Sequence, residues 1–288
     1  MGVPYAEVIG DPVEHSKSPL IHKFWLEKLG LDYGFGRTRV RPEELEGFLE
    51  TRRADPDWCG CSVTLPLKAA AVGLMAELAP SAAAIGAVNC ILRRGRELSR
   101  LVGHNTDADG FLEPVRARMA EPDTSRIAEV IGAGGAAAAV CYSLDRHDFT
   151  VFSYARSGRR AAEMRQRLGM EHDFGLVADV ADLNSPSSSP APDDPSVLRL
   201  FVNATPLGMT GFPPLEVRLD RLPAQAIVYD LVYSPLETPL LRQALARGLA
   251  VIGGLDMLIG QAAIAFDLFF AQAAPREHDE ELRGLLVR

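Results

Sequence analysis

The sequence predicts an α/β protein of two domains, and three observations support this fold class. First, residues 131–137 read I-G-A-G-G-A-A, a glycine-rich run that has more than a hundred residues before it. Second, short apolar runs alternate with helical patterns both before and after this run, as they do in α/β folds. Third, the chain has 288 residues, 47% of them hydrophobic, which is enough for two ordinary cores.

The part of the chain before the glycine run predicts an α/β domain with a mixed sheet. Strand and helix patterns alternate from residue 6 onward, and Pro42 stands where a proline suits the first turn of a helix. The last two strands are joined around Arg94 and Gly95. The expected strands are 6–10, 33–40, 59–64, 87–92 and 97–102, and the expected helices are 19–29, 42–52 and 67–75.

The alternation restarts at Ile127 and predicts a parallel sheet in the second domain. Residues 184–196, which are rich in Ser, Pro and Asp, are expected to form a surface loop. Residues 257–270 are strongly apolar and are expected to form a helix that crosses back to the first domain. The expected strands are 127–131, 150–154, 200–203, 226–231 and 250–252, and the expected helices are 136–144 and 159–168.

The glycine run fits the pattern of a dinucleotide-binding loop. In the pattern G-x-G-x-x-A, Gly132 allows a tight strand-to-helix turn, Gly134 lets the backbone approach a pyrophosphate, and Ala137 permits close helix packing. The N–H groups at the start of the following helix would meet the phosphates. The alternative interpretation is an ordinary strand-to-helix turn. The residues expected to contact the cofactor in this run are Gly132, Ala133, Gly134, Gly135 and Ala136.

The residues after the second nucleotide strand favour NADP over NAD. A domain that binds NAD places an acidic residue about 20 residues after the glycines, to bind the ribose 2′-hydroxyl. Residues 152–160 contain no acid and three arginines. Of these, Arg156 and Arg160 are expected to bind a 2′-phosphate, because a planar guanidinium matches phosphate oxygens. The alternative is a solvated basic start to a helix.

Composition excludes several classes of function. The formal net charge of −8 argues against nucleic acid as the main partner. No stretch approaches the roughly 20 apolar residues that span a bilayer, and the N-terminus lacks signal-peptide regions, so the expected location is the cytoplasm. The four cysteines and six histidines are not spaced as metal ligands, and reduced thiols are expected in that compartment. We therefore expect no metal and a small-molecule substrate.

Four polar clusters before the glycine run could carry chemistry, and each has a structural alternative. Ser16 and Ser18 offer two hydroxyls at a helix start, which suit a carboxylate, but Ser18 before Pro19 is also typical of an N-cap. Lys68 follows a strand at the edge where α/β proteins bind ligands, although a single lysine is usually solvated. For Asn89 the structural alternative is that its amide satisfies backbone groups, and for Asp107 it is that the side chain caps a helix.

Taken together, the polar clusters and the strand-end run N-A-T-P-L-G-M resemble the shikimate dehydrogenase family. The resemblance spans nearly the whole chain in eight ordered motifs. These are similar to H-S-x-S-P (15–19), V-T-x-P-x-K (63–68), G-A-V-N (86–89), N-T-D (105–107), G-A-G-G-A (132–136), N-A-T-x-x-G-M (203–209), Y-x-P-x-x-T-x-L (233–240) and G-L-x-M-L-x-x-Q-A (254–262).

The resemblance implies NADP-dependent reversible reduction of 3-dehydroshikimate to shikimate, a step of chorismate and aromatic amino-acid biosynthesis. It also implies a substrate-binding catalytic domain over residues 1–104, completed by 256–288. A Rossmann-like NADP-binding domain would occupy residues 105–255. We expect a monomer or a homodimer.

Carried over to this sequence, the resemblance makes Lys68 and Asp107 the catalytic residues. Lys68 would give a proton to the developing alkoxide, and Asp107 would orient the ammonium and a substrate hydroxyl. The residues implied to bind substrate are Ser16, Ser18, Thr64, Asn89, Tyr233 and Gln261. The residues implied to bind the cofactor besides the glycine run are Arg156, Arg160, Thr205 and Gly254.

The sequence departs from the family pattern at a few positions. Ser62 stands where the family often has Asn, and Ala155 and Ser157 flank the arginine of the family's N-R-T. The alternatives are therefore a quinate or aminoshikimate dehydrogenase of the same family, or a catalytically idle nucleotide-binding relative. Retention of both Lys68 and Asp107 argues against the idle relative, because a binding protein has no need of a proton donor.

Overall fold

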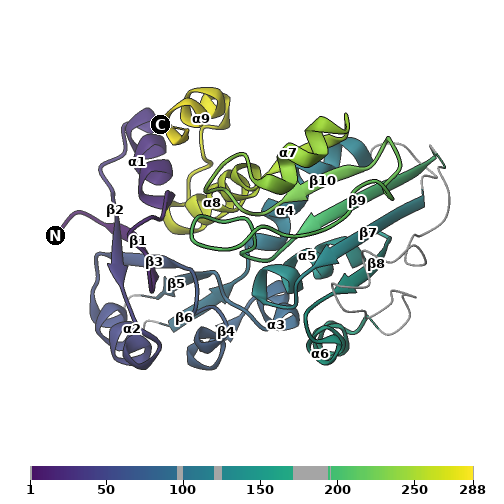
Figure 1. The fold of residues 1–288 in the computed structure, drawn as a ribbon. Helices are drawn as coiled ribbons and strands as arrows, with labels where there is room; N and C mark the ends of the chain where they lie inside the picture. Colours follow the sequence, from purple (N-terminus) through teal and green to yellow (C-terminus); the bar gives the residue numbers. More distant parts are fainter. Residues whose placement is uncertain (1, 96–99, 120–124, 171–193, 195, 288) are drawn as a thin grey trace. The chain divides into compact units, whose positions relative to one another are not determined.

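A computed structural model describes residues 2–95, 100–119, 125–170, 194 and 196–287. The chain divides into two compact units, each with its own sheet (Figure 1). The first unit contains residues 1–106 and 259–288, and the second contains residues 107–258. The α/β fold class is confirmed, because the first sheet is mixed and all pairs in the second sheet are parallel.

The sheet of the first unit has the strand order β2-β1-β3-β5-β6-β4. Strand β1 pairs in parallel with β2 and β3, whereas β5 pairs antiparallel with β3 and β6. The expected strands at residues 6–10, 33–40 and 59–64 are therefore confirmed, as is the mixed character of the sheet. The strands are β1 (Tyr5–Gly10), β2 (Gly34–Arg39), β3 (Trp58–Val63), β4 (Glu77–Leu78), β5 (Cys90–Arg94) and β6 (Arg100–His104).

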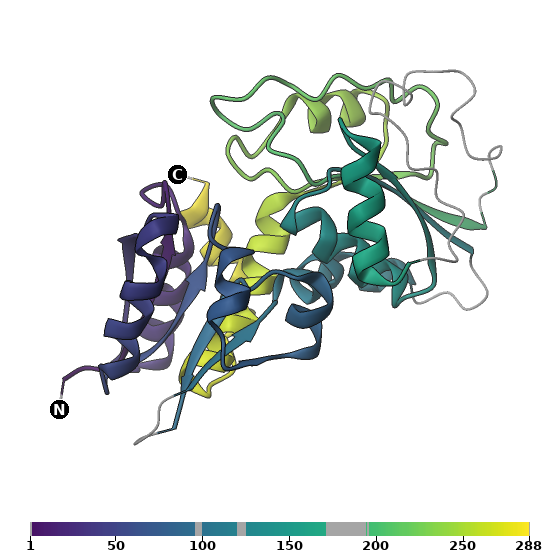
Figure 2. The same cartoon turned by 90° about the horizontal axis from the view of Figure 1, so that it is seen from below.

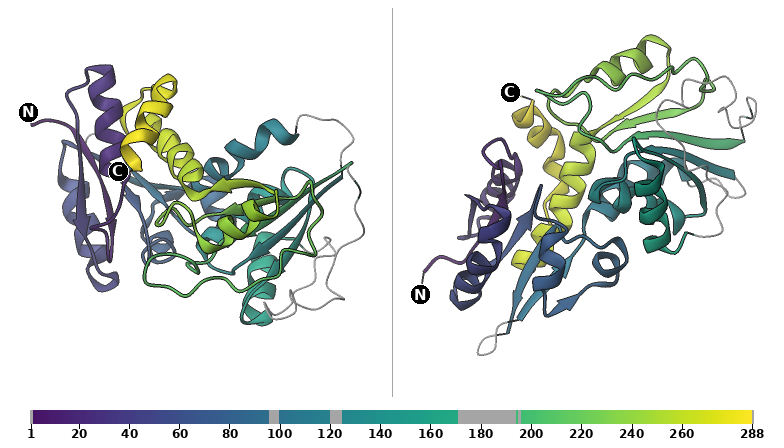
Figure 3. Two further views of the ribbon diagram at one scale, coloured as in Figure 1. Left: turned by 45° about the horizontal axis from the view of Figure 1, so that its top comes forward. Right: turned by 60° about the horizontal axis from the view of Figure 1, so that its bottom comes forward.

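Helix α1, near the start of the chain, lies beside α9, near its end, in the first unit (Figure 3). Lys28 of α1 forms an ion pair with Glu281 of α9 at 2.7 Å, and Lys17 Nζ donates to the Leu286 carbonyl. This arrangement makes the C-terminal segment part of the first core. The helices of this unit are α1 (Ser18–Leu29), α2 (Leu45–Ala54), α3 (Pro80–Ile85), the later part of α8 (Gly254–Phe270) and α9 (Asp279–Leu286).

The helix expected over residues 67–75 is wrong, because only a short 3-10 helix forms, over Ala70–Leu74. The cause lies in the backbone before it. The carbonyl of Lys68 accepts the Val88 N–H at 2.8 Å, so it is used between segments rather than inside a helix. Lys68 consequently lies in a turn that is bonded to the segment leading into β5.

The second unit has a five-stranded sheet of order β11-β10-β9-β7-β8. Helices α5 and α6 lie in front of this sheet in the view from below (Figure 2), and α7 covers the opposite face. Helices α5 and α7 lie on opposite faces because the right-handed units β7-α5-β8 and β10-α7-β11 step across the sheet in opposite directions. The strands are β7 (Ser125–Ile131), β8 (Phe149–Tyr154), β9 (Val197–Asn203), β10 (Ile227–Asp230) and β11 (Ala250–Gly253). The helices are α4 (Asp107–Arg116), α5 (Gly135–Asp145), α6 (Gly158–Leu168) and α7 (Pro239–Ala246).

Two expectations fall partly or wholly outside the described residues: the loop at 184–196 and the start of the strand at 97–102. The helix expected at 257–270 is confirmed within α8. No helix among the described residues is both long enough and apolar enough to cross a membrane.

An aromatic cluster in the first unit encloses His22 of α1. The His22 ring is 0% exposed and stacks on Phe35 with ring centroids 3.9 Å apart, and Phe266 and Phe269 of α8 lie around it. Neither ring nitrogen has a hydrogen-bond partner among the described residues. Burial away from water disfavours the charged ring and lowers the pKa of His22 to about 3.

This burial predicts an acid-sensitive first unit. Unfolded His22 takes up a proton below its usual pKa of 6.5, whereas the folded ring stays neutral down to about 3. The contribution of neutral His22 to the free energy of unfolding is therefore fully present above pH 6.5. Between pH 6.5 and about pH 3 the free energy of unfolding falls by about 1.4 kcal/mol per pH unit, or by about 2 kcal/mol at pH 5. The measurement is urea unfolding followed by tryptophan fluorescence at pH 7.5 and pH 5, because Trp25 and Trp58 both lie in this unit.

The control for this prediction is the variant His22→Leu, which has no group that titrates at this position. Its free energy of unfolding should fall less between the two pH values than that of the wild type. Equal losses in both proteins would show that His22 does not cause the acid sensitivity.

Candidate active site

The register of the first sheet brings the expected substrate-binding segments to one edge. Ile9 pairs with Val63, and Cys90 pairs with both Ser62 and His104. The carboxyl ends of β1, β3 and β6 and the start of β5 therefore lie along the same edge. This edge carries the segments that hold Ser16 and Ser18, Thr64 and Lys68, Asn89, and Asp107.

Ser16 and Ser18 form a pair of hydroxyls after β1. Ser16 Oγ donates to Ser18 Oγ at 3.3 Å and accepts the Ser18 N–H at the same distance. The interpretation of Ser18 as an N-cap is wrong, because the N-cap of α1 is Lys17, which makes no side-chain cap bond. Ser18 is the first residue of the helix, so its hydroxyl is not needed to cap the helix.

Backbone hydrogen bonds hold Thr64, Lys68 and Asn89 close together. The Thr64 N–H donates to the Ile9 carbonyl at 2.9 Å, and the Val63 N–H donates to the Asn89 carbonyl at 2.7 Å. With the bond from Val88 to Lys68 described above, these contacts fix both sides of the turn at Lys68. The side chains of Thr64 and Lys68 are half-buried. Their position therefore depends mainly on main-chain bonds.

Asn89, Thr106 and Gln261 form a side-chain network at the same edge. Asn89 Oδ1 accepts the Thr106 N–H at 2.7 Å, as the backbone-satisfying interpretation of Asn89 predicts. Asn89 Nδ2 also donates to Thr106 Oγ1 at 2.9 Å and to Gln261 Oε1 at 3.5 Å. Asp107 follows directly as the first residue of α4 and is 4% exposed. Sequence reasoning missed Thr106, although it stands inside the N-T-D motif.

In the second unit, the parallel register aligns the ends of all five strands. Ile131 pairs with Tyr154 on one side and with Asn203 on the other, and Asp230 pairs with both Asn203 and Gly253. Strand β8 follows β7 on one side of it, whereas β9 lies on the other side. The switch point between β7 and β9 is where sheets of this kind bind nucleotides.

The glycine loop leaves β7 at this switch point. Gly132 has a φ of +129°, and a Cβ placed on it would lie 3.0 Å from the Ala204 carbonyl oxygen and 3.3 Å from the Ala137 Cβ. Gly134 is different, because a Cβ placed there would meet no protein atom within 4 Å. Gly134 is the N-cap of α5 and provides no side-chain cap. The structure thus fits a phosphate here: the loop is tight, and open space lies over the helix N-terminus.

Arg156 and Arg160 follow β8 and are exposed. Neither arginine makes an ion pair with a residue that the structure describes. Arg159 lies between them and pairs with Glu163 at 2.9 Å. The Gly132 N–H donates to the Tyr154 carbonyl at 2.7 Å, so the end of β8 is bonded to the glycine loop. Arg156 lies two residues after Tyr154.

The three remaining predicted residues lie after β9, β10 and β11. Thr205 Oγ1 donates to Asn203 Oδ1 at 2.6 Å, inside the turn that follows β9. Tyr233 is half-buried, and this burial raises the pKa of its hydroxyl. Gly254 begins α8, and a Cβ on it would lie only 2.2 Å from the Leu231 carbonyl oxygen. Packing alone therefore requires glycine at position 254, whatever its role toward a cofactor.

Sequence reasoning did not single out the buried cluster formed by Asn203, Asp230 and Thr238. Each of these three side chains is 0% exposed, and they join the ends of β9 and β10 to the start of α7. A signal was available: Asp230 is an acid at the end of an otherwise apolar strand, the place where buried acids tend to be functional.

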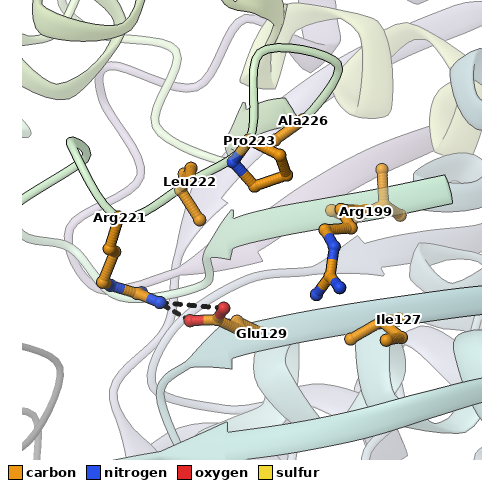
Figure 4. Close-up of a pocket in the computed structure, with 8 residues that line it drawn as sticks. Ile127, Glu129, Arg199, Arg221, Leu222, Pro223 and Ala226 are labelled. Carbon is orange, nitrogen blue, oxygen red and sulfur yellow. Dashed lines mark hydrogen bonds and ion pairs between the residues drawn. The ribbon is translucent and has the colours of Figure 1, made fainter. Parts of the chain in front are cut away.

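A cavity elsewhere in the second unit contains none of the predicted site residues. Glu129 and Arg221 line it and form a buried ion pair, with Glu129 Oε1 2.9 Å from Arg221 Nη1 (Figure 4). Glu129 lies two residues before the end of β7, and Arg221 is 10% exposed at its side chain. This pair is distinct from the row of strand ends.

The mixed and parallel sheets, together with the glycine loop, define a two-domain α/β protein with a Rossmann-like half. A family model described as the shikimate dehydrogenase substrate binding domain matches residues 8–91, and one described as the shikimate 5'-dehydrogenase C-terminal domain matches residues 254–282. A shikimate dehydrogenase (NADP(+)) from Sphingopyxis alaskensis is 48% identical and covers 99% of this chain and 97% of its own length. The chain belongs to the shikimate dehydrogenase family.

Solved structures of relatives share the fold over nearly the whole chain. Shikimate 5-dehydrogenase from Thermus thermophilus, in complex with NADP(H) and shikimate, has a TM-score of 0.79 and 36% identity, covering 99% of this chain and 100% of that one. Quinate dehydrogenase from Corynebacterium glutamicum, in complex with NAD, has a TM-score of 0.82 and 26% identity, covering 98% and 99%. The fold alone therefore does not separate the two substrates.

Two glycines of the loop, Gly132 and Gly134, are predicted to respond differently to replacement by alanine. Gly132→Ala should destabilise the protein by about 1–3 kcal/mol, because it forces a strained φ against the Ala204 carbonyl. Gly134→Ala should lower the melting temperature less than Gly132→Ala does, because alanine is there only a poorer N-cap, and it should weaken NADP binding about tenfold or more, as 1.4 kcal/mol of steric cost would. Thermal melting and titration calorimetry with NADP measure the two effects. A Gly134→Ala protein that binds NADP normally would contradict this placement of the phosphates.

Proposed function

We propose that this protein catalyses the NADP-dependent, reversible reduction of 3-dehydroshikimate to shikimate. The observation that carries the proposal is the edge of the first sheet, where hydroxyl, amide and ammonium groups gather. The 48% identity to a shikimate dehydrogenase (NADP(+)) over 99% of the chain supports it. On this proposal most of the substrate-binding residues belong to the first unit and the second unit binds the cofactor, in the pathway that leads to chorismate and the aromatic amino acids.

The substrate is a hydroxylated cyclohexene carboxylic acid, and the site residues match its groups. Ser16, Ser18 and Tyr233 supply hydroxyls for the carboxylate. Thr64, Asn89 and Gln261 supply hydroxyl and amide groups for the ring hydroxyls. Because Gln261 Oε1 accepts bonds from Asn89 Nδ2 and Thr106 Oγ1, its amide is oriented by the protein before substrate arrives.

Lys68 is the proposed proton donor. NADPH, when bound, supplies the hydride that reduces the ketone carbon. Lys68 Nζ then gives its proton to the ketone oxygen as that oxygen becomes a hydroxyl, and the neutral amine takes the proton back in the reverse direction. The ammonium charge also stabilises the alkoxide as it develops. Asp107, a buried carboxylate directly after Thr106, is the second proposed catalytic residue.

The cofactor is held by the second unit on this proposal. The N-terminus of α5 and the backbone of Gly132, Gly134 and Gly135 receive the pyrophosphate. Arg156 and Arg160 bind the 2′-phosphate, which distinguishes NADP from NAD. Thr205 and Gly254, which follow β9 and β11 at the same edge of the sheet, are the other proposed cofactor-binding residues.

The first experiment measures nicotinamide absorbance with shikimate and quinate, each with NADP and NAD. Reduction of NADP with shikimate supports the proposal. A preference for quinate or aminoshikimate would move the protein to a sister activity, and the buried Ser62 is the position to exchange in that case. Binding of NADP without any turnover would favour an idle relative.

Cell location and assembly belong to the same proposal. We propose a cytoplasmic enzyme that is a monomer or a homodimer and acts on small molecules only. Fractionation of cells and size-exclusion chromatography with light scattering test these two points.

Replacement of Lys68 is predicted to remove most of the turnover. Lys68→Ala should lower kcat by about 10²- to 10⁴-fold, the usual contribution of general acid catalysis, and change the KM for shikimate much less. The control is Lys23→Ala, which removes an exposed lysine of α1. Near-normal kcat in Lys68→Ala would overturn the assignment.

Replacement of Arg156 is predicted to affect NADP and not NAD. Arg156→Ala should raise the KM for NADP about 10- to 100-fold, since a hydrogen bond to a charged group contributes about 1.5–3 kcal/mol. The KM for NAD should stay nearly constant. Arg159→Ala is the matched control, because Arg159 lies three residues further along, is exposed and is already paired with Glu163. Similar effects of both variants would mean that general positive charge, not Arg156, binds the phosphate.

A further inference from the structure

A buried carboxylate, Asp230, connects three segments of the second unit. Its Oδ1 accepts Asn203 Nδ2 at 2.9 Å and the Val232 N–H at 3.1 Å. Its Oδ2 accepts Thr238 Oγ1 at 2.6 Å. Burial raises the pKa of Asp230, whereas these three donors favour the ionised form. All contacts lie within the second unit.

Asn203 links Asp230 by hydrogen bonds to the turn that carries Thr205. Asn203 Oδ1 accepts the N–H of Thr205 at 3.1 Å and its hydroxyl at 2.6 Å. Asn203 Nδ2 donates to the Leu207 carbonyl at 2.9 Å as well as to Asp230. The amide can make both donations only in one orientation, which Asp230 fixes.

The same carboxylate holds both ends of the segment that carries Tyr233. At one end, Asp230 accepts the Val232 N–H. At the other end it accepts the hydroxyl of Thr238, which caps α7 by accepting the Leu241 N–H at 3.2 Å. Tyr233 lies between these two attachment points. Its position therefore depends on the Asp230 carboxylate.

We propose that Asp230 is a positioning residue that sets the Thr205 turn and the Tyr233 segment together. On the proposed function, to which this inference adds, Thr205 serves the cofactor and Tyr233 serves the substrate carboxylate. One buried carboxylate then governs the affinity for both ligands without touching either. Its geometry matters more than its charge, because each contact is a hydrogen bond from a neutral donor.

This proposal predicts rescue by the amide. In Asp230→Asn, the remaining oxygen keeps the two N–H donors, and the new NH₂ donates to Thr238 Oγ1, which has a second lone pair to accept it. Asp230→Asn should therefore keep both KM values within about threefold of wild type. Asp230→Ala should raise the KM for NADP and the KM for shikimate about 5- to 30-fold each, the range that 1–2 kcal/mol corresponds to.

If Asp230→Ala does not fold, a second variant, Thr238→Val, tests the contact between Asp230 and Thr238 by itself. Thr238→Val keeps the shape of the side chain and removes only its hydroxyl. It releases the far end of the Tyr233 segment and leaves the bond between Asp230 and Asn203 in place. The KM for shikimate should rise about fivefold, as expected for loss of the hydrogen bond to Asp230, and the KM for NADP should rise less. The lost bond from the Leu241 N–H should lower the melting temperature.

Glu129→Gln is the control for loss of stability alone. It weakens the buried pair with Arg221 in the same unit, away from the strand ends (Figure 4). It should lower the melting temperature and leave both KM values unchanged. If the Asp230 and Thr238 variants also change only the melting temperature, Asp230 is merely structural and the proposal is overturned.

The test remains decisive if the proposed function fails. NADP binding is measured by calorimetry in the same variants, with no turnover required. If the wild type binds NADP but converts no substrate, the proposed function is overturned. The NADP affinities of the variants then test the inference about Asp230 by themselves. Weaker binding in Asp230→Ala, restored in Asp230→Asn, supports the positioning role, and equal binding in all variants overturns it.

Discussion

The parallel register of the second sheet is the constraint on which the rest of the site depends. Because every strand runs in the same direction, Tyr154, Ile131, Asn203, Asp230 and Gly253 end in one row. Each loop that follows this row leaves from the same edge, so residues distant in the sequence become neighbours without further interactions. The fold therefore decides where a ligand can bind, and the loop residues decide which ligand it is.

Main-chain bonds and side-chain bonds both position the candidate site residues, and the two kinds respond differently to replacement of a side chain. In the first unit, main-chain bonds such as that from Val88 to Lys68 fix the segments, and these bonds survive side-chain replacement. In the second unit, the side chains of Asn203, Asp230 and Thr238 do this work. Replacement of Asn203, Asp230 or Thr238 therefore removes a positioning bond directly, whereas replacement of the Val88 or Lys68 side chain leaves the bond between their backbones in place.

Much of the fold follows from local pattern, because strand alternation and the glycine loop are encoded by neighbouring residues. Gly132 is an example: its positive φ and its closeness to Ala137 both lie inside the motif. Two errors arise where separate segments meet. The helix expected at 67–75 fails because the Lys68 carbonyl bonds to Val88, and the Asp230 cluster was missed because its partners are 27 and 8 residues away. The Ser18 cap is a local error, since the preceding residue, Lys17, is the N-cap.

Gly134 and Gly254 show why a structure is needed before a role is assigned to a glycine in a sequence motif. Gly254 and Gly134 both belong to sequence motifs that the family resemblance links to the cofactor. A side chain on Gly254 would collide with the Leu231 backbone, whereas one on Gly134 would enter open space. A packing requirement fully explains the first glycine, but no protein atom explains the second. Open space at Gly134 is compatible with the phosphate that we propose at the uncapped start of α5.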